Sequence, residues 1–428
     1  MENPCKFYND LKNLLSINSV KGNKTPSAPF GEGVKNALRF FLELAASFGF
    51  ETINYDDYCG EVVYGEGQEI GIIGHLDVVP VGAGWKYPPF SLTQDNGYLI
   101  GRGIADDKGP MLSVLYALKE LKDSKIKCNK KFRLFVGCDE ETGWQDVEYL
   151  KTKTTIPEYG FSPDGDFPVG YAEKGVFYVK TVLPRFKNFK DLKGGTVINA
   201  VCDSAQVTAT SENILKGKDL KRYGLEKVGD TVYAKGVAAH GSAPHLGKNA
   251  FLPILRLMQD CGEDVGDIID YLFRDKWKLS EMENEQGKIT LSPDLTRETD
   301  IGTELICDCR VPAPFTENDL LAVIKKAPFK VTAEMHHVPV MVLKDGKFVN
   351  TLLNAYNAYA DKKGLPISMG GSTFARVFEK GCAFGPEFPE ENNHIHEADE
   401  RIKETHFIKM HEIYKKALFD LAALKENI

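Results

Sequence analysis

The chain has 428 residues, which is long for one hydrophobic core and predicts two domains. Hydrophobic residues make up 43% and charged residues 27%, proportions that are ordinary for a soluble globular enzyme. The formal net charge is −8, and the sequence contains no block rich in Lys or Arg. This charge pattern argues against a nucleic-acid partner.

Nine cysteines are spread along the chain without a CxxC pair or a disulfide-rich spacing. We therefore expect reduced thiols and a cytoplasmic location. The first residues lack the basic and apolar stretches of a signal peptide, and no apolar run reaches about 18 residues, the length that spans a bilayer. We expect no membrane partner.

The first part of the chain alternates between helical and strand patterns. Apolar residues at helical spacing predict helices over residues 6–17 and 34–48. Residues 62–64 and 69–80 have the apolar character of buried strands. The other expected elements are a hairpin within 84–100, a helix over 111–124 that opens at Asp107-Lys108-Gly109-Pro110, and strands over 132–138 and 156–164. Polar residues follow these strands, which indicates an α/β sheet with its site at the carboxyl ends.

After about residue 178 the pattern changes to the alternation of antiparallel strands. Expected strands lie within 176–184, 196–201, 230–241 and 303–312, and expected helices lie around 211–222 and 249–260. The helix–strand pattern returns over 348–364 and ends with a helix over 404–425. We predict an α/β catalytic domain, residues 1–178 and 347–428, with a mixed, mostly parallel sheet flanked by helices. Residues 179–346 would form an inserted α+β lid domain with antiparallel sheets.

His75 and Asp77 end one expected strand, and on an extended chain they project to the same side. A metal-bound His usually donates its other ring N–H to a carboxylate, a role open to Asp77. Taken alone, this spacing fits an exposed strand end at least as well.

Acidic residues follow two other elements. Asp106 and Asp107 precede an expected helix within a glycine-rich frame, and adjacent carboxylates repel each other unless a cation compensates them. Helix capping explains one Asp but not both. Asp139, Glu140 and Glu141 follow a buried strand, where one carboxylate could bind a metal while its neighbour acts as a general base. A solvated loop is the alternative interpretation.

Asp164 follows a further strand, while His240, His394 and His396 lie near turns. Each alone could be structural, but together the candidates recur in the order His, Asp, Glu, Asp, His. Two metal ions need a bridging carboxylate with nitrogen or oxygen ligands on each side. Because no cysteine belongs to the set, the pattern excludes a structural thiolate zinc site. Mixed His and carboxylate ligands suit zinc, with manganese or cobalt as alternatives. No GxxxxGK[ST] or GxSxG motif is present.

These motifs resemble the superfamily of co-catalytic metallopeptidases, which includes aminoacylase, carboxypeptidase G, succinyl-diaminopimelate desuccinylase and carnosinase-like dipeptidases. The resemblance spans residues 71–400 and is carried, in the family order, by GHLDVVPVGAGW, GRGIADDKGP, DEETG, FSPDGDFP, AHGSAPH, CDCRVP, GGSTFAR and HIHEADE. Among its branches, DDKGP, SPDGDFP and GGSTFAR are most similar to dipeptidase V, whose members cleave dipeptides with a free amino terminus.

The resemblance implies a ligand set for two divalent metal ions. Asp106 would bridge the ions and lie between the other ligands, which are His75 and Asp164 for the first ion and Glu141 and His396 for the second. Here His396 is preferred over His394 because it begins the family's His-x-x-(Asn/Asp)-Glu pattern. Asp77 would orient His75, and Glu140 would be the general base that activates a metal-bridging water.

The resemblance also implies roles in the inserted domain. His240 would stabilise the oxyanion, while Arg310 and Asn199 would bind the substrate carboxylate with backbone N–H groups around Gly370 and Gly371. A guanidinium is a forked, permanently charged partner for a carboxylate. A glycine-rich turn lets backbone N–H donors come close to a ligand. The chain departs from the branch at Cys202, where proline is common.

The expected function is therefore hydrolysis of dipeptides by a monomer that uses its own His240. Two alternatives remain open. The same metal centre could serve an N-acyl amino acid deacylase or desuccinylase, or the chain could be a non-enzymatic protein that binds metal or peptide.

Overall fold

A computed structural model describes residues 4–428, so residues 1–3, the start of the segment in which we expect no signal peptide, lie outside the described residues. The chain forms two compact units. Unit 1 contains the described residues through Tyr171, with Met341–Ile367 and Thr373–Ile428, and unit 2 contains Ala172–Val340 and Ser368–Ser372. The insertion expected from the sequence starts at residue 179. In the structure this residue lies inside a strand, Gly175–Val182, that belongs to unit 2 over its whole length.

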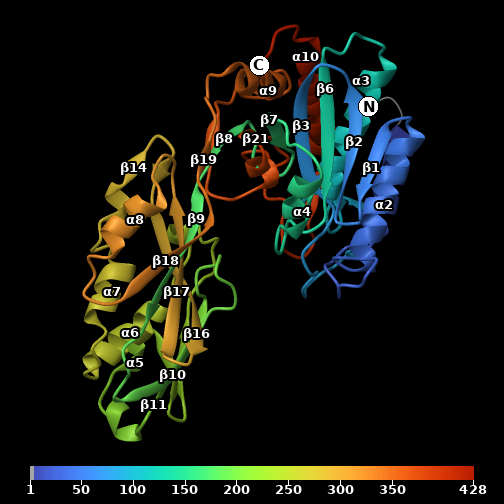
Figure 1. The fold of residues 1–428 in the computed structure, drawn as a ribbon. Helices are drawn as coiled ribbons and strands as arrows, with labels where there is room; N and C mark the ends of the chain where they lie inside the picture. The colour runs from blue at the N-terminus through green and yellow to red at the C-terminus, as the bar shows by residue number, and fades with distance from the viewer. Residues whose placement is uncertain (1–3) are drawn as a thin grey trace. The chain divides into compact units, whose positions relative to one another are not determined.

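A mixed sheet runs through unit 1 in the order β1-β2-β6-β3-β7-β21-β8-β19, with β20 paired to β8 (Figure 1). Its strands are β1 (Glu51–Tyr55), β2 (Cys59–Gly65), β3 (Gln68–His75), β6 (Lys130–Gly137), β7 (Tyr159–Ser162), β8 (Gly170–Glu173), β19 (Val340–Met341), β20 (Ile367–Met369) and β21 (Lys380–Ala383). Strands β6, β3, β7 and β21 pair in parallel, whereas β1 and β2 are antiparallel to their neighbours and β8 is antiparallel to β21. The division between the units falls within or beside β8, β19 and β20. The expected mixed sheet is confirmed, with its parallel pairs at the centre.

Helices flank this sheet on both faces. The helices of unit 1 are α1 (Pro4–Ser16), α2 (Glu32–Ser47), α3 (Lys108–Asp123), α4 (Gln145–Lys153), α9 (Lys347–Asn357), α10 (Glu404–Ala423) and the short η4 (Phe374–Val377). Helix α3 approaches the sheet at Gly74, where an added Cβ would meet Met111 Sδ at 2.5 Å. On the opposite face, the Phe378 ring lies against Gly71 and Gly160, which leave room for it by having no side chain. Strands β4 (Thr93–Asp95), β5 (Tyr98–Ile100) and β22 (Arg401–Lys403) form a separate small sheet.

Unit 2 contains two four-stranded antiparallel sheets, ordered β16-β17-β9-β18 and β10-β11-β13-β12. The strands are β9 (Gly175–Val182), β10 (Phe189–Gly194), β11 (Ser204–Ala209), β12 (Leu225–Val228), β13 (Thr231–Lys235), β16 (Thr290–Thr299), β17 (Gly302–Val311) and β18 (Val331–His337), with a short hairpin of β14 (Glu283–Asn284) and β15 (Gly287–Lys288). The helices are α5 (Leu220–Tyr223), α6 (Phe251–Asp260), α7 (Gly266–Phe273), α8 (Glu317–Ile324) and the short η1 (Glu212–Leu215), η2 (Pro244–Leu246) and η3 (Leu279–Glu281).

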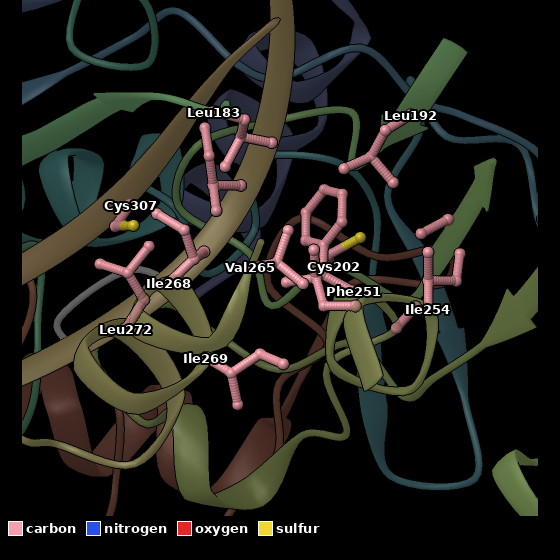
Figure 2. Packing of buried hydrophobic residues seen from close by; sticks show 14 of the residues in the cluster. Leu183, Leu192, Cys202, Phe251, Ile254, Val265, Ile268, Ile269, Leu272 and Cys307 are labelled. Atoms are coloured by element: carbon pink, nitrogen blue, oxygen red, sulfur yellow. The ribbon is translucent and has the colours of Figure 1, made fainter. Parts of the chain in front are cut away.

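Alternation along β17 separates the core of unit 2 from its polar residues. Cys307 and Cys309 are fully buried in the hydrophobic cluster that also contains Phe251 and Ile268. Figure 2 shows Cys307, Phe251 and Ile268 within this cluster. Successive residues of a strand point to opposite faces. Asp308 and Arg310 therefore lie on the other face of the same sheet.

One strand expected from the sequence is absent from the part of the chain that the structure describes, and three helices found there were not expected. The strand expected over 196–201 is wrong, because this segment contains a bend at Thr196 and a turn over 198–199, and pairs only through an isolated bridge from Ala200 to His240. The helices α4, α7 and α8 were not expected. Along the described chain, no helix has both the length and the apolar character that crossing a bilayer requires.

A buried ionic network joins three strands of the unit 1 sheet. Arg133 on β6 donates from Nε and Nη2 to the Glu61 carboxylate at 2.6 and 3.0 Å, and from Nη1 to Glu69 at 3.1 Å. Arg133 and Glu61 are 4% and 1% exposed. Removing one partner leaves a buried charge without compensation, which is strongly destabilising.

We predict that Arg133→Met lowers the free energy of unfolding of unit 1 by about 3–5 kcal/mol. Urea denaturation followed by circular dichroism measures this change. Lys131→Met is the matched control on the same strand, since the Lys131–Glu69 pair is about one-third exposed. Its cost should stay below about 1 kcal/mol. Equal losses for both variants would contradict the argument.

Candidate metal centre and substrate-binding residues

The carboxyl ends of three neighbouring parallel strands bring the acidic residues of unit 1 together. His75 is the last residue of β3 and pairs in register with Gly137, the last residue of β6. Glu140 and Glu141 follow β6, and Asp164 follows β7. Because β6, β3 and β7 are parallel neighbours, these side chains share one edge of the sheet.

The Asp106 carboxylate lies between two imidazole rings. Its Oδ1 is 2.9 Å from His75 Nε2, and its Oδ2 is 2.9 Å from His396 Nε2. The His396 ring is also 3.1 Å from Glu141, and His75 Nε2 is 3.7 Å from Asp164. The five residues expected as ligands are thus brought together, with one carboxylate shared between the two histidines.

Asp77 contacts both sides of this cluster. Its Oδ1 is 3.4 Å from His75 Nδ1, and its carboxylate accepts hydrogen bonds from the backbone N–H groups of Glu140 at 3.2 Å and Glu141 at 3.1 Å. The His75 ring also lies 3.0 Å from the Asp77 carbonyl oxygen through Nδ1. One buried aspartate therefore contacts a histidine and also accepts hydrogen bonds from the loop that carries both glutamates.

Burial and mutual repulsion shift the pKa values of the carboxyl groups in this cluster. Burial and the charge of Asp164 raise the pKa of Glu140 well above its usual value. Burial and the charge of Asp106 raise the pKa of Asp164 to about 8 and that of Glu141 to about 7. Such crowding is relieved by a bound cation, which favours the ionised carboxylates.

The donor set fits divalent metal ions. Ligand atoms of His75, Asp106 and Glu141 lie within 4.8 Å of one another, and so do those of His75, Glu140 and Asp164. Mixed nitrogen and oxygen donors suit zinc or manganese. The second group contains Glu140, so geometry allows its carboxylate to act either as a ligand or as a base.

The neighbouring polar residues have different partners. Asp107 occupies the N-cap position of α3 but makes no side-chain cap hydrogen bond, so the capping interpretation is wrong for it. Its Oδ2 instead accepts from the His75 backbone N–H at 3.1 Å. Asp139 is buried and accepts a hydrogen bond from Lys21 at 2.6 Å, so its carboxylate is not in a solvated loop. His394 lies 3.0 Å from Arg401 through Nε2.

Glu400 is a residue of the site whose contacts the sequence did not predict. Its buried carboxylate accepts from the backbone N–H groups of Gly103, Ala105 and Asp106 and forms a 2.7 Å ion pair with Arg102. The loop that carries Asp106 is therefore held by one carboxylate. The available signal was Arg102 inside a glycine-rich loop, since a buried Arg requires an acidic partner.

Unit 2 gathers the other predicted residues around the His240 loop. The backbone N–H groups of Val201 and Gly241 donate to the carbonyl oxygens of Ala239 and Asn199 at 2.9 and 2.7 Å. His240 Nδ1 accepts from the Ser242 backbone N–H at 3.2 Å. Nδ1 also lies 2.7 Å from the Ser242 hydroxyl, which donates to it in the tautomer that carries the ring proton on Nε2.

Arg310 lies close to the same loop. Its Nη1 donates to the Gly370 carbonyl oxygen at 3.0 Å, and a Cβ added at Gly370 would lie 2.8 Å from Ser242 Cβ. Gly371 borders open space, since an added Cβ there would meet nothing within 4 Å. Unit 2 therefore brings together His240, Asn199, Arg310, Gly370 and Gly371, as the sequence grouped them.

Residues 71–420 match peptidase family M20/M25/M40. The chain belongs to this family. It is a metal-dependent peptidase with a candidate dinuclear site, and this family membership covers most of the chain.

Relatives match over nearly their full length. The YtjP protein of Bacillus subtilis, a dipeptidase by name, is 32% identical over 96% of each chain. A Staphylococcus epidermidis protein, also a dipeptidase by name, is 30% identical over 98% of each chain.

Solved structures share the fold at low identity. Human carnosine dipeptidase 1 has a TM-score of 0.59 and 13% identity, covering 98% of this chain and 97% of its own. The dipeptidase Dug1p of Saccharomyces cerevisiae has a TM-score of 0.60 and 14% identity, covering 98% and 96%. These likenesses agree with the α/β fold.

The two nearby histidines allow a test of the ligand set. We predict that His396→Ala lowers the zinc content of the reconstituted protein, because it removes a nitrogen donor beside Asp106 and Glu141. His394→Ala should keep the zinc content of the unaltered protein, because its ring faces Arg401. Plasma mass spectrometry after dialysis measures both. Loss of zinc from His394→Ala but not from His396→Ala would show that His394, and not His396, is the metal ligand.

Proposed function

We propose that this protein hydrolyses the peptide bond of dipeptides that carry a free amino terminus. The observation that carries the proposal is the Asp106 carboxylate, held 2.9 Å from both His75 and His396 with Glu140 on the neighbouring loop. The names of the full-length relatives support the choice of dipeptides over other amides.

His75 and Asp164 would hold one divalent ion, Glu141 and His396 the other, and Asp106 would lie between them. When bound, the ions lower the pKa of water and polarise a carbonyl oxygen. Zinc suits this donor set best, and manganese or cobalt are also compatible.

Glu140 would take a proton from the attacking water and return it to the leaving amine. Its pKa, raised by burial and by Asp164, favours proton uptake, and its backbone is fixed by Asp77. Asp77 would also keep the His75 ring in its binding orientation.

Unit 2 would supply recognition and oxyanion stabilisation. His240 would donate from Nε2 to the developing oxyanion, a role supported by the Ser242 backbone donor at Nδ1. Arg310 would bind the substrate carboxylate through its forked guanidinium, helped by Asn199 and the backbone near Gly370 and Gly371. We further propose a cytoplasmic monomer in which each chain uses its own His240.

A panel of dipeptides tests the substrate class after zinc or manganese reconstitution. We expect release of both amino acids from dipeptides with a free amino terminus and much slower turnover of their N-acetylated forms. Chromatography of the products measures both rates. Preference for the acylated forms would instead support the deacylase alternative, and intact metal without turnover of either would support a binding protein.

Glu140→Gln tests the proton-transfer role. It should lower kcat by about 10²–10⁴, the usual contribution of a general acid–base group, while the metal content stays that of the unaltered protein. Loss of metal together with activity would show that Glu140 acts as a ligand. Full activity with both ions retained would exclude Glu140 as the base.

Mixing two inactive variants tests whether His240 acts within its own chain. We expect no recovery of activity when His240→Ala and Glu140→Ala proteins are combined, because each chain would still lack one group. Recovered activity in the mixture would show that His240 serves a neighbouring chain.

A further inference from the structure

Arg310 is held by a buried aspartate two residues earlier on the same strand. Arg310 Nε donates to Asp308 Oδ1 and Nη2 donates to Asp308 Oδ2, both at 2.7 Å. Asp308 is fully buried, and Arg310 is 4% exposed. Two parallel hydrogen bonds between a planar guanidinium and a planar carboxylate fix the plane of the guanidinium as well as its position.

The third bond of Arg310 fixes its remaining direction. Nη1 donates to the Gly370 carbonyl oxygen at 3.0 Å. A guanidinium has five N–H groups, and these contacts use one each from Nε, Nη1 and Nη2. One N–H group of Nη1 and one of Nη2 make no hydrogen bond to residues 4–428, and two such N–H groups at the end of a guanidinium, its terminal fork, can bind a second carboxylate.

Asp308 also contacts the His240 loop. A Cβ added at Gly241 would lie 2.3 Å from Asp308 Oδ2 and 3.2 Å from the Asn199 carbonyl carbon. The absence of a side chain at Gly241 therefore lets the carboxylate pack beneath the loop. One aspartate thus lies against the backbone next to His240 and Asn199 while it holds Arg310.

We infer that Asp308 is a positioning residue that aims the terminal fork of Arg310 at the α-carboxylate of the substrate. The inference rests on the proposed role of Arg310. The Asp308–Arg310 pair is formally neutral, so recognition depends on two directed hydrogen bonds more than on net positive charge. A C-terminal amide offers one acceptor and one N–H donor to this fork, so it loses one of the two bonds.

Asp308→Asn preserves the shape of the side chain but opposes an NH₂ group to a guanidinium N–H. Only one of the two 2.7 Å bonds can then form, and the guanidinium loses its fixed plane. Hydrogen bonds to charged groups are strong enough that losing their alignment costs about ten- to a hundredfold in affinity.

The experiment compares L-Ala-L-Leu with L-Ala-L-Leu-amide by steady-state kinetics on the metal-reconstituted full chain. For Asp308→Asn we expect KM for the free dipeptide to rise about ten- to a hundredfold with kcat changed much less. For the amide, kcat/KM should stay within about threefold, because the aligned fork contributes less to it. A general structural defect would lower both substrates together, and that result would overturn the inference.

Asp294→Asn is the matched control. Asp294 is a second fully buried aspartate of unit 2 that accepts hydrogen bonds from the Ser292 hydroxyl and from the Asp308 backbone N–H, so this variant changes a carboxyl group beside Asp308 while the Asp308 carboxylate itself stays in place. Burial raises the pKa of Asp294 to about 9, so the neutral amide replaces a group that is itself neutral at pH 7. We expect its preference for free dipeptide over amide to equal that of the unaltered protein.

Two further variants separate the possible failures. Asp308→Glu keeps the charge but displaces the guanidinium by one methylene, so it should show a smaller loss of the same selectivity; this variant decides the question if Asp308→Asn does not fold. Arg310→Ala tests the proposed function itself. If it leaves the preference for the free carboxylate intact, the role of Arg310 is wrong. If Arg310→Ala removes the preference while neither Asp308 variant changes it, only the inference on Asp308 is wrong.

Discussion

Crowding of carboxyl groups at the ends of parallel strands is the constraint on which the site depends. Burial and neighbouring carboxylates raise the pKa values of Glu140, Glu141 and Asp164. Against the effect of burial, hydrogen bonds from His396 and His75 lower the pKa of Asp106. Like charges buried together are costly unless a cation compensates them. The surrounding structure maintains this arrangement, because Glu400 fixes the Asp106 loop and Asp77 fixes the loop of both glutamates.

Much of the fold could be predicted because unit 1 follows simple patterns. The buried run that ends at His75 and the helix that starts after Asp107 have the periodicity and boundary residues that the structure confirms. The segment 196–201 misled the prediction because it is rich in Thr, Val and Ile, which are typical of strands, although it pairs only at Ala200. Helix α4 was missed because it is short and follows Trp144, whose left-handed backbone is unusual for a bulky residue.

The residues of the candidate site could be predicted where they directly follow strands, but their contacts with distant segments could not. Side chains that follow strands, such as His75, Glu141 and Asp164, are readable because parallel strands converge at one edge. Contacts between segments distant in sequence are not readable in this way. Glu400 lies nearly 300 residues from the loop it holds. Asp308 alternates with the buried Cys307 and Cys309, which places it on the same face of β17 as Arg310, but this pattern does not show which groups it contacts.

The position of the Asp106 carboxylate between His75 and His396 supports our proposal that two metal ions share it. Anomalous diffraction from zinc-loaded crystals, recorded on both sides of the zinc absorption edge, tests it directly. The account predicts two anomalous peaks about 3.5–4 Å apart, one beside His75 and one beside His396, with an Asp106 oxygen on each. A single peak, or peaks that leave Asp106 unliganded, would contradict it.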